Sequence, residues 1–290
     1  MENFVLPDSV SINLEITLRC NYRCAHCSVS AGPERPADYI SSEVLDDIHR
    51  QILYIEARGV WIDDINLIGG EPTLNLREFA RVCETVSQWG YRLMMTTNGW
   101  WLGSEKASQI FFDIASRYLD DGYGDTNFYI RISNDRWHDA FRPAWLRGQE
   151  RLKKALLRRL DENAGRHPEI LEHEDWIYVD WERRPWAVVP VGRGAAFGCF
   201  DKSGHCCPNN LVYGPNGAVV DFCCNGQIDE GFGTCKDDPL FLLYAFSRFL
   251  EEVRPNCTEC GRRAVEWKLE NMPQLRETYM SEFMQGDVYA

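Results

Sequence analysis

Residues 20–27 read CNYRCAHC and place three thiols within eight residues, directly after a run in which apolar and polar side chains alternate. Three cysteines are too few for a closed tetrahedral metal site, and structural zinc sites favour two pairs of ligands. A metal or cluster held by three thiolates keeps one position open for chemistry. Cys20, Cys24 and Cys27 are therefore candidate ligands of an open site. The alternative is structural zinc, completed by His26 or by a distant cysteine.

The composition is that of a globular chain with a sizeable core: 290 residues, 44% hydrophobic and 26% charged. A formal net charge of −13 argues against a broad nucleic-acid surface, which needs a basic face. The N-terminus shows no secretory signal, and no apolar run approaches the roughly 20 residues of a spanning helix. We therefore expect a cytoplasmic protein without membrane or nucleic-acid partners. In such a reducing compartment the twelve cysteines favour metal or cluster ligation over disulfides.

Strand-like and helix-like segments alternate along the first two thirds of the chain. Apolar alternation predicts strands at 12–18, 65–68, 92–96, 127–133, 176–179 and 187–191. Helical periodicity and capping residues predict helices that start near Ser41 or Ser42, at 76–89, at 104–119 and at 146–160. This order implies an α/β fold with a parallel sheet built from βαβ units. Six such strands suit a partial (β/α)6, TIM-like barrel better than a closed barrel of eight.

The pattern changes after Gly192-Arg193-Gly194, where the chain becomes rich in glycine and cysteine. We expect a hairpin at 211–222 with its turn at 214–217, then a helix from Pro239 to about Val253, and a final helix. We place a domain boundary near Ala196. The expected division is a barrel domain at 1–196, a small Cys-rich domain at 197–270, and a C-terminal helix and tail at 271–290.

Four segments together resemble a known family. Cys20, Cys24 and Cys27 match the CxxxCxxC signature of the radical S-adenosylmethionine (SAM) enzymes. Gly69-Gly70-Glu71-Pro72 follows the second expected strand, as the family's GGEP motif does. Thr97-Asn98-Gly99 ends the third strand, as the family's TNG does, and Ser133 ends the fourth. The resemblance covers residues 12–196.

The resemblance implies a [4Fe-4S] cluster held by Cys20, Cys24 and Cys27, with SAM on the fourth iron. One electron would cleave SAM to methionine and a 5′-deoxyadenosyl radical, which abstracts a substrate hydrogen. His26 takes the place of an aromatic residue beside the adenine. The implied contacts of SAM are Gly69, Gly70, Glu71, Asn98, Ser133, Gly192 and Arg193. Two glycines in sequence also suit a close approach of the backbone to a ligand.

The late cysteines resemble the auxiliary-cluster extension called SPASM, in its shortened, one-cluster twitch form. One of Cys206 and Cys207, one of Cys223 and Cys224, and both Cys257 and Cys260 would bind an auxiliary [4Fe-4S] cluster. Five residues separate Gly217 from Cys223 where the family has four, so the ligand within that pair stays open. A four-cysteine zinc ribbon is the alternative. Cys199 and Cys235 stay unassigned, so a second auxiliary cluster is also open, whereas Cys83 is expected to be a buried core thiol.

The expected function is a net oxidation, the dehydrogenation of a small polar molecule, in which the auxiliary cluster takes an electron from the substrate radical. An electron donor such as flavodoxin or ferredoxin is implied. Arg131, Asp135 and His138 follow the fourth strand and are candidates for handling the substrate. A peptide-crosslinking maturase is the alternative, although only about eleven residues precede the first strand, which leaves no room for a peptide-recognition domain. A zinc-stabilised, non-catalytic binding protein is the alternative from another class.

Overall fold

In the part of the chain that the structure describes, eight strands form one sheet, in the order β5-β4-β3-β2-β1-β6-β7-β8. The computed structural model describes residues 7–27, 29–118, 128–135, 137–164, 177–180, 210–220, 233–253 and 271–279. Strands β1 to β5 run parallel to one another. The expected α/β class with a parallel sheet is therefore confirmed.

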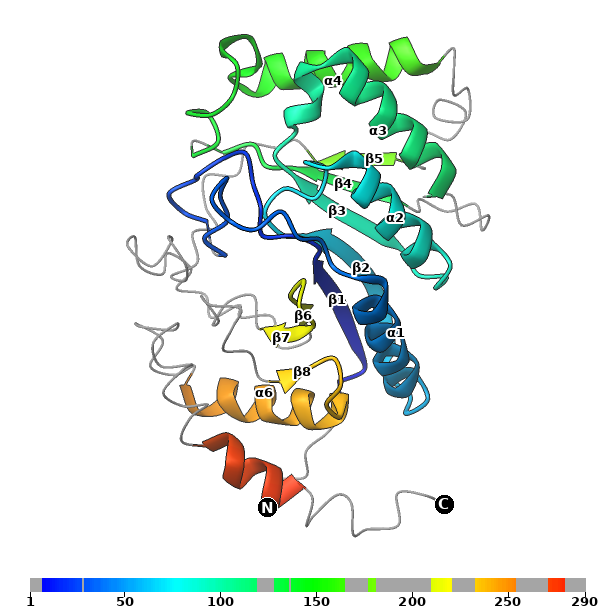
Figure 1. Cartoon of the computed structure of the whole chain (residues 1–290), viewed down its shortest axis with the longest axis vertical. Helices are drawn as coiled ribbons and strands as arrows, with labels where there is room; N and C mark the ends of the chain where they lie inside the picture. Colours follow the sequence, from blue (N-terminus) through cyan, green and yellow to red (C-terminus); the bar gives the residue numbers. More distant parts are fainter. Residues whose placement is uncertain are drawn as a thin grey trace.

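Helices connect the parallel strands in the expected rhythm. The strands are β1 (Ser9–Glu15), β2 (Trp61–Ile68), β3 (Leu93–Thr97), β4 (Phe128–Ile132) and β5 (Ile177–Asp180). The helices are α1 (Ser42–Glu56), α2 (Leu76–Ser87), α3 (Glu105–Tyr118) and α4 (Gln149–Ala164). Figure 1 shows α1, α2 and α3 along one side of the strands, with α4 beyond α3. Successive side chains of a strand point to opposite faces, so every second residue of these strands points to the face that the helices do not cover.

The core fills the space between the sheet and these helices. Ile12, Leu14 and Ile16 on and just after β1 are fully buried there, together with Ile48 and Ile52 of α1. Residues two apart on a strand and three or four apart on a helix share one face, which is why both stripes reach the same core. Near α3, the rings of Trp101 and Phe111 stack with centroids 4.1 Å apart. Trp101 belongs to a 3-10 turn, Trp100–Gly103, that the sequence patterns did not predict.

Capping residues set the helix ends largely where the sequence predicts them. Ser41 accepts a hydrogen bond at Oγ from the backbone N–H of Val44 and so begins α1. Asn75 caps α2 in the same way. Gly59 and Gly90 adopt φ values of +83° and +80° just beyond the ends of α1 and α2, a conformation that glycine adopts without strain.

The face of the sheet turned away from the helices, called here the inner face, carries polar side chains. Its described members include Ser11, Asn13, Glu15, Asp64, Asn66 and Arg131. All of these except Asp64 lie between two buried apolar residues that face the helices. A ladder of amides crosses this face: Asn66 Nδ2 donates to Asn13 Oδ1 at 3.0 Å, and Asn13 Nδ2 donates to Asn210 Oδ1 at 3.4 Å. The strand pairing Asn13–Asn66 places these two side chains opposite each other.

The expected hairpin is present and extends the main sheet. It consists of β6 (Asn210–Tyr213) and β7 (Ala218–Val220), which pair antiparallel, and β6 lies parallel to β1. Strand β8 (Gly233–Thr234) pairs with β7, and α6 (Pro239–Val253) follows it with the predicted bounds. Residues 271–279 form the final helix. Although the hairpin falls within the expected 197–270 domain, its first strand is continuous with the barrel sheet, so the domain division stays a prediction.

The bounds of two strands differ from their predictions by three residues or more. The strand expected at 12–18 ends at Glu15, because its partner β2 ends at Ile68 and the chain then forms only isolated bridges, Thr17–Tyr39 and Arg19–Gly32. Conversely, β2 begins at Trp61 instead of Ile65, since pairing with Ser9 continues the ladder through a polar segment. The strand expected at 187–191 lies outside the described residues.

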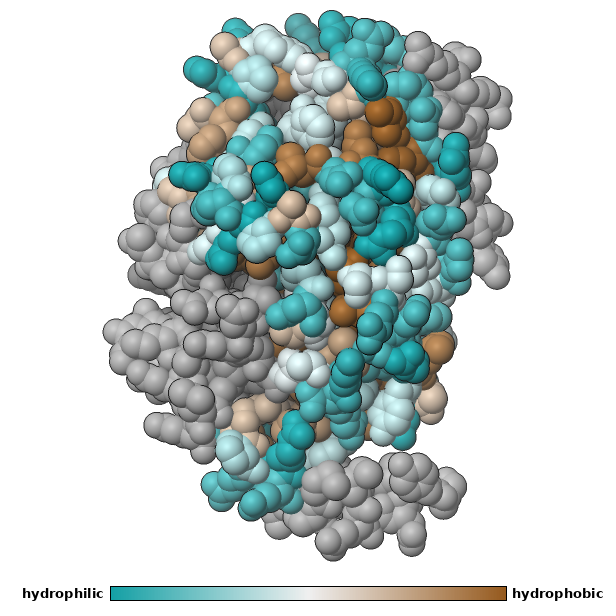
Figure 2. Space-filling model, in the orientation of Figure 1, coloured by the Kyte–Doolittle hydropathy of each residue, from teal (hydrophilic) through white to brown (hydrophobic). Residues whose placement is uncertain are grey.

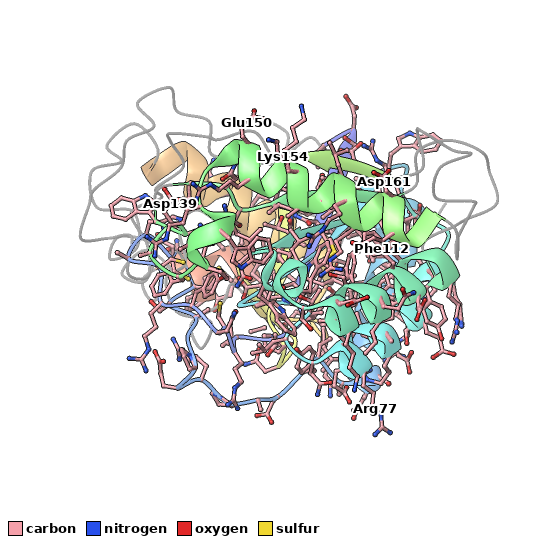
Figure 3. All side chains as sticks on the ribbon, turned by 90° about the horizontal axis from the view of Figure 1, so that it is seen from above. Arg77, Phe112, Asp139, Glu150, Lys154 and Asp161 are labelled. Carbon is pink, nitrogen blue, oxygen red and sulfur yellow. The ribbon has the colours of Figure 1, made fainter. Side chains whose placement is uncertain are left out.

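The surface over the helices is mainly polar. Figure 2 shows a face on which hydrophobic residues emerge in small groups between hydrophilic ones, as is normal for a surface in contact with water. Figure 3 shows Glu150 and Lys154 projecting from α4, while Phe112 lies beneath that helix in the buried interior. Within the described part of the chain, no helix is long and apolar enough to span a bilayer.

Candidate functional site

The three early cysteines lie on the connection between β1 and α1, residues 16–41, called here the cysteine loop. Cys20 and Cys24 are buried, Cys27 is half-buried, and all three belong to one small apolar cluster with Tyr22 and Ala31. The loop leaves the C-terminal end of β1, which is where parallel α/β sheets place their ligand sites. The structure therefore brings the three predicted ligands together at the expected edge of the sheet.

The local backbone already points hydrogen-bond donors at two of these sulfur atoms. The N–H of Tyr22 donates to Cys20 Sγ at 3.3 Å, and the N–H of Ala31 donates to Cys27 Sγ at 3.3 Å. Such donors favour a thiolate, but burial dominates and raises the pKa of Cys20 to about 12. A thiolate ligating iron is compensated by the charge of the metal. This donor set of three clustered sulfurs therefore fits an iron–sulfur cluster with one open position.

Gly69 and Gly70 press against the start of the cysteine loop. A Cβ atom on Gly69 would lie 2.2 Å from the carbonyl oxygen of Thr17, and one on Gly70 would lie 2.2 Å from that of Arg19. The N–H of Gly70 donates to Thr17 O at 2.7 Å, and that of Glu71 to Arg19 O at 2.9 Å. The interpretation of the sequence explains these glycines by the close approach of a ligand. The structure adds a second reason, the close packing of two backbones.

Glu71 joins the GGEP loop (69–72) to the TNG loop (97–99). Its fully buried carboxylate accepts from Thr97 Oγ1 at 2.8 Å and from the backbone N–H of Asn98 at 2.7 Å. Thr73 donates to the same carboxylate through its backbone N–H and its hydroxyl. Burial raises the pKa of Glu71 and the four donors oppose that rise. The side chain expected among the SAM contacts thus holds the two loops together.

Asn98 connects the TNG loop to the cysteine loop. Its Nδ2 lies 2.9 Å from Asn21 Oδ1 and 3.7 Å from Cys20 Sγ, and its Oδ1 accepts from the N–H of Trp100 at 3.0 Å. Ser133, directly after β4, donates its backbone N–H to Thr97 O at 2.8 Å. The four segments singled out in the sequence therefore meet at one end of the sheet through direct hydrogen bonds. Asn21 and Thr97 were not predicted to take part.

Two of the three substrate candidates form a cluster with His26. Asp135 Oδ2 lies 2.8 Å from His138 Nδ1 and 3.6 Å from His26 Nε2. Burial raises the pKa of Asp135, but the hydrogen bond and charge of His138 prevail and hold it near 2. The ring of His26 stacks on Trp137 with centroids 5.6 Å apart. This cluster ties the segment after β4 to the cysteine loop.

The third candidate, Arg131, belongs to a different surface. It lies on β4 between Ile130 and Ile132, which face the helices, so its side chain belongs to the inner face of the sheet. Its charge lowers the pKa of Asp64 on β2, as that of Arg92 does, against the stronger effect of burial. The inner face beside the site is therefore charged as well as polar. Glu15, on the same face, was not singled out in the sequence. Its one signal was a carboxylate at a polar position of an alternating strand.

The remaining cysteines and the other predicted SAM contacts divide into those inside and those outside the described residues. Cys235 is buried in the main core, 3.9 Å from Asp47 Oδ2 and against the backbone of Gly217. Cys83 is fully buried on α2, which confirms it as a core thiol. The positions outside the described residues are Gly192, Arg193, Cys199, Cys206, Cys207, Cys223, Cys224, Cys257 and Cys260.

Comparisons with known proteins agree with this geometry. The model of the radical SAM superfamily matches residues 14–118, which contain the cysteine, GGEP and TNG segments. YydG of Bacillus subtilis, described as a peptide biosynthesis protein, is 24% identical over 56% of this chain and 43% of its own. An S-adenosylmethionine-dependent nucleotide dehydratase of Selenomonas ruminantium is 33% identical over 30% of this chain and 29% of its own. The matches thus span less than half of these relatives.

The fold has a counterpart among solved structures. BtrN, crystallised with AdoMet and 2-DOIA, superposes with a TM-score of 0.50 at 17% identity, over 88% of this chain and 89% of its own. At this identity the likeness establishes the fold alone. It supports the partial-barrel architecture expected from the alternating strands and helices.

Proposed function

Since residues 14–118 place the chain in the radical SAM superfamily of enzymes, we propose that it cleaves SAM reductively and oxidises a substrate by hydrogen abstraction. Cys20, Cys24 and Cys27 would hold a [4Fe-4S] cluster, and SAM would bind at its open iron. When bound, the two supply a 5′-deoxyadenosyl radical, formed by one-electron cleavage of the C5′–S bond, that removes a hydrogen atom from the substrate.

The observation that carries the proposal is the hydrogen-bonded junction of the three loops. Asn98 reaches the cysteine loop at Asn21 and Cys20, Glu71 holds Thr97 and Asn98, and Gly70 binds the root of the cysteine loop. A cofactor held at this junction would meet backbone groups of all three loops in fixed positions. Fixed polar groups of this kind orient a bound cofactor without reorganisation during the reaction.

The individual SAM contacts follow from this junction as proposals. The backbone of Gly69 to Glu71 is available to the amino group of SAM, since the side chain of Glu71 is already hydrogen-bonded at both oxygens. Asn98 and Ser133 would contact its ribose and carboxylate. Gly192 and Arg193 are proposed near the adenine on the family resemblance, as are the auxiliary-cluster ligands between Cys206 and Cys260.

Anaerobically prepared protein with SAM and dithionite tests the proposal. We expect a brown protein that contains iron and sulfide and releases 5′-deoxyadenosine and methionine in equal amounts. A colourless protein that holds only zinc would overturn the proposal in favour of a zinc-stabilised binding protein.

Two substrate classes remain in the proposal, and one observation bears on them. YydG, matched over the larger part of this chain, is described as a peptide biosynthesis protein, which favours peptide modification as the second candidate beside oxidation of a small polar molecule. Incubation with each class of candidate substrate separates them. The true substrate raises 5′-deoxyadenosine formation and changes mass by the loss of two hydrogen atoms.

A further inference from the structure

Among the described residues, the inner face carries two buried acceptor oxygens that lack a hydrogen-bond partner, one on Glu15 and one on Asn66. Glu15, at the C-terminal end of β1, is 1% exposed, and its Oε2 has no hydrogen-bond partner among the described residues. Within the same described part of the chain, the buried Oδ1 of Asn66 on β2 also has none. Asn66 pairs with Asn13, two residues before Glu15 on the neighbouring strand. Glu15 and Asn66 therefore lie on the same face of neighbouring strands, offset by two residues.

The amide ladder fixes which atom Asn66 presents. Its Nδ2 donates to Asn13 Oδ1, and Asn13 Nδ2 donates onward to Asn210 Oδ1. Turning the Asn66 amide around would set two oxygens against each other, so Oδ1 is the atom left over. Both unsatisfied atoms of the pair are therefore oxygens that can accept hydrogen bonds.

Glu15 also lacks the charge compensation seen at its neighbour on the inner face. Burial raises the pKa of Asp64 too, but the charges of Arg92 and Arg131 oppose that rise. Burial alone acts on Glu15 and raises its pKa to about 8. A buried polar group left without a partner destabilises a fold by about 1–3 kcal/mol. Such uncompensated groups are found at sites that await a ligand.

The position of Glu15 connects it with the proposed reaction site. Glu15 pairs with Ile68, the residue before Gly69, and Thr17, two residues further along, accepts from the N–H of Gly70. Glu15 therefore lies one step below the GGEP loop, on the face turned away from the helices. A group bound at Glu15 would lie beside the junction of the three loops.

We propose that Glu15 and Asn66 form an anchoring subsite for a primary ammonium group of the substrate. This inference rests on the proposed function, because a bound amine is a substrate only if the proposed reaction takes place. A single ligand atom that binds both acceptors must carry at least two hydrogens to donate. An ammonium group carries three N–H donors and a charge opposite to that of the carboxylate, whereas a hydroxyl group has one donor and no charge. The chemistry of the pair thus selects an amine over a plain alcohol.

Infrared spectroscopy of the whole protein at neutral pH tests this subsite directly. The carbonyl stretch of a protonated carboxyl is assigned to Glu15 by its absence in Glu15→Gln. Ethylammonium chloride should abolish this band in the wild type, because pairing with the cation ionises the carboxyl. Ethanol, without charge, and tetramethylammonium chloride, without N–H donors, should leave it in place. A band that survives ethylammonium, that responds equally to all three probes, or that is missing from the ligand-free wild type overturns the proposal.

A second variant keeps the test decisive where Glu15→Gln fails to fold. Asn66→Leu keeps the shape of the side chain and removes the acceptor. Loss of the Glu15 band should then need an ethylammonium concentration at least roughly tenfold higher. Asp64→Asn, on the same strand and face, is the matched control and should leave the titration unchanged. Equal effects of Asn66→Leu and Asp64→Asn would contradict the subsite.

The ammonium subsite and the proposed function can be rejected independently of each other. If ethylammonium abolishes the Glu15 band in a protein that forms no 5′-deoxyadenosine, the ammonium site is supported and the proposed reaction is rejected. Formation of 5′-deoxyadenosine by a protein whose Glu15 band ignores ethylammonium would do the opposite.

Discussion

At the scale of single residues, the fully buried Glu71 has the widest influence on the site. Its two oxygens accept from Thr73, Thr97 and Asn98, so one carboxylate sets the positions of two loops. Asn98 then extends this hydrogen-bond network to the cysteine loop by donating to Asn21. The site is therefore organised by a chain of short polar contacts, and each link is open to test.

Glu71→Gln should loosen this junction. The amide places an NH2 group where backbone N–H and hydroxyl groups already donate, so at least one buried donor loses its acceptor, at a cost of about 1–3 kcal/mol in stability. We expect a lower Tm and weaker binding of SAM, measured by calorimetry. Glu78→Gln is the control, because Glu78 makes only a partly exposed ion pair with Arg81. Equal effects of both changes would contradict the role given to Glu71.

Glu15 makes the stability of the protein depend on pH. Its folded-state pKa of about 8 lies above the ordinary value of 4.5, so the folded state keeps a proton that the unfolded state releases. Stability contributed by that proton is complete below about pH 4.5 and is lost as pH rises through 8. Glu15→Gln removes this dependence, so its Tm relative to the wild type should rise steadily between pH 5 and pH 8. A difference in Tm that is flat across this range would show that Glu15 is already paired.

At the scale of elements, the decisive contact is that of the GGEP loop with the root of the cysteine loop. Gly70→Ala would set a Cβ atom against the backbone of Arg19, and backbone cannot move aside as a flexible side chain can. We expect loss of SAM binding and a reduced iron content. Gly103→Ala is the matched control, since a Cβ atom there meets nothing within 4 Å. A Gly70→Ala protein with normal iron and SAM binding would contradict this packing.

Local patterns in the sequence were enough for the elements but not for their contacts. The capping of α1 by Ser41, the bounds of α6 and the burial of Cys83 all follow from neighbours in sequence, and they are confirmed. Two features depend on partners far along the chain. The early end of β1 is set by β2, and the pairing of β6 with β1 joins residues about 200 apart.

The same difference between local sequence patterns and contacts with distant residues applies to the site. Its motifs lie at strand ends, where a short residue pattern carries the information, and the structure brings them together as predicted. The hydrogen bonds of Glu71 and the isolation of Glu15 depend on which atoms meet across strands. Residue type alone does not record this, so the sequence predicts neither the hydrogen bonds of Glu71 nor the missing partner of Glu15 Oε2 among the described residues. The contact of Glu71 with SAM stays a prediction.

At the scale of the whole molecule, two sets of cysteines serve the proposed reaction in different ways. The early set meets the GGEP and TNG loops at one end of the sheet. The late set, from Cys206 to Cys260, is proposed to hold an auxiliary cluster that takes an electron from the substrate. Replacing Cys257 and Cys260 with Ala should remove about one cluster's worth of iron and leave SAM cleavage partly intact. An unchanged iron content would remove the auxiliary cluster from the proposal.

The measurement that tests the central claim most directly is 5′-deoxyadenosine formation by the Cys20→Ala, Cys24→Ala, Cys27→Ala protein. Wild type and variant are compared anaerobically with SAM and dithionite, and Cys83→Ala serves as a control that removes a thiol from the core instead of the loop. The account predicts that the triple variant forms no 5′-deoxyadenosine, whereas any Cys83→Ala protein that folds retains the activity. Formation of 5′-deoxyadenosine by the triple variant would contradict the assignment of the site.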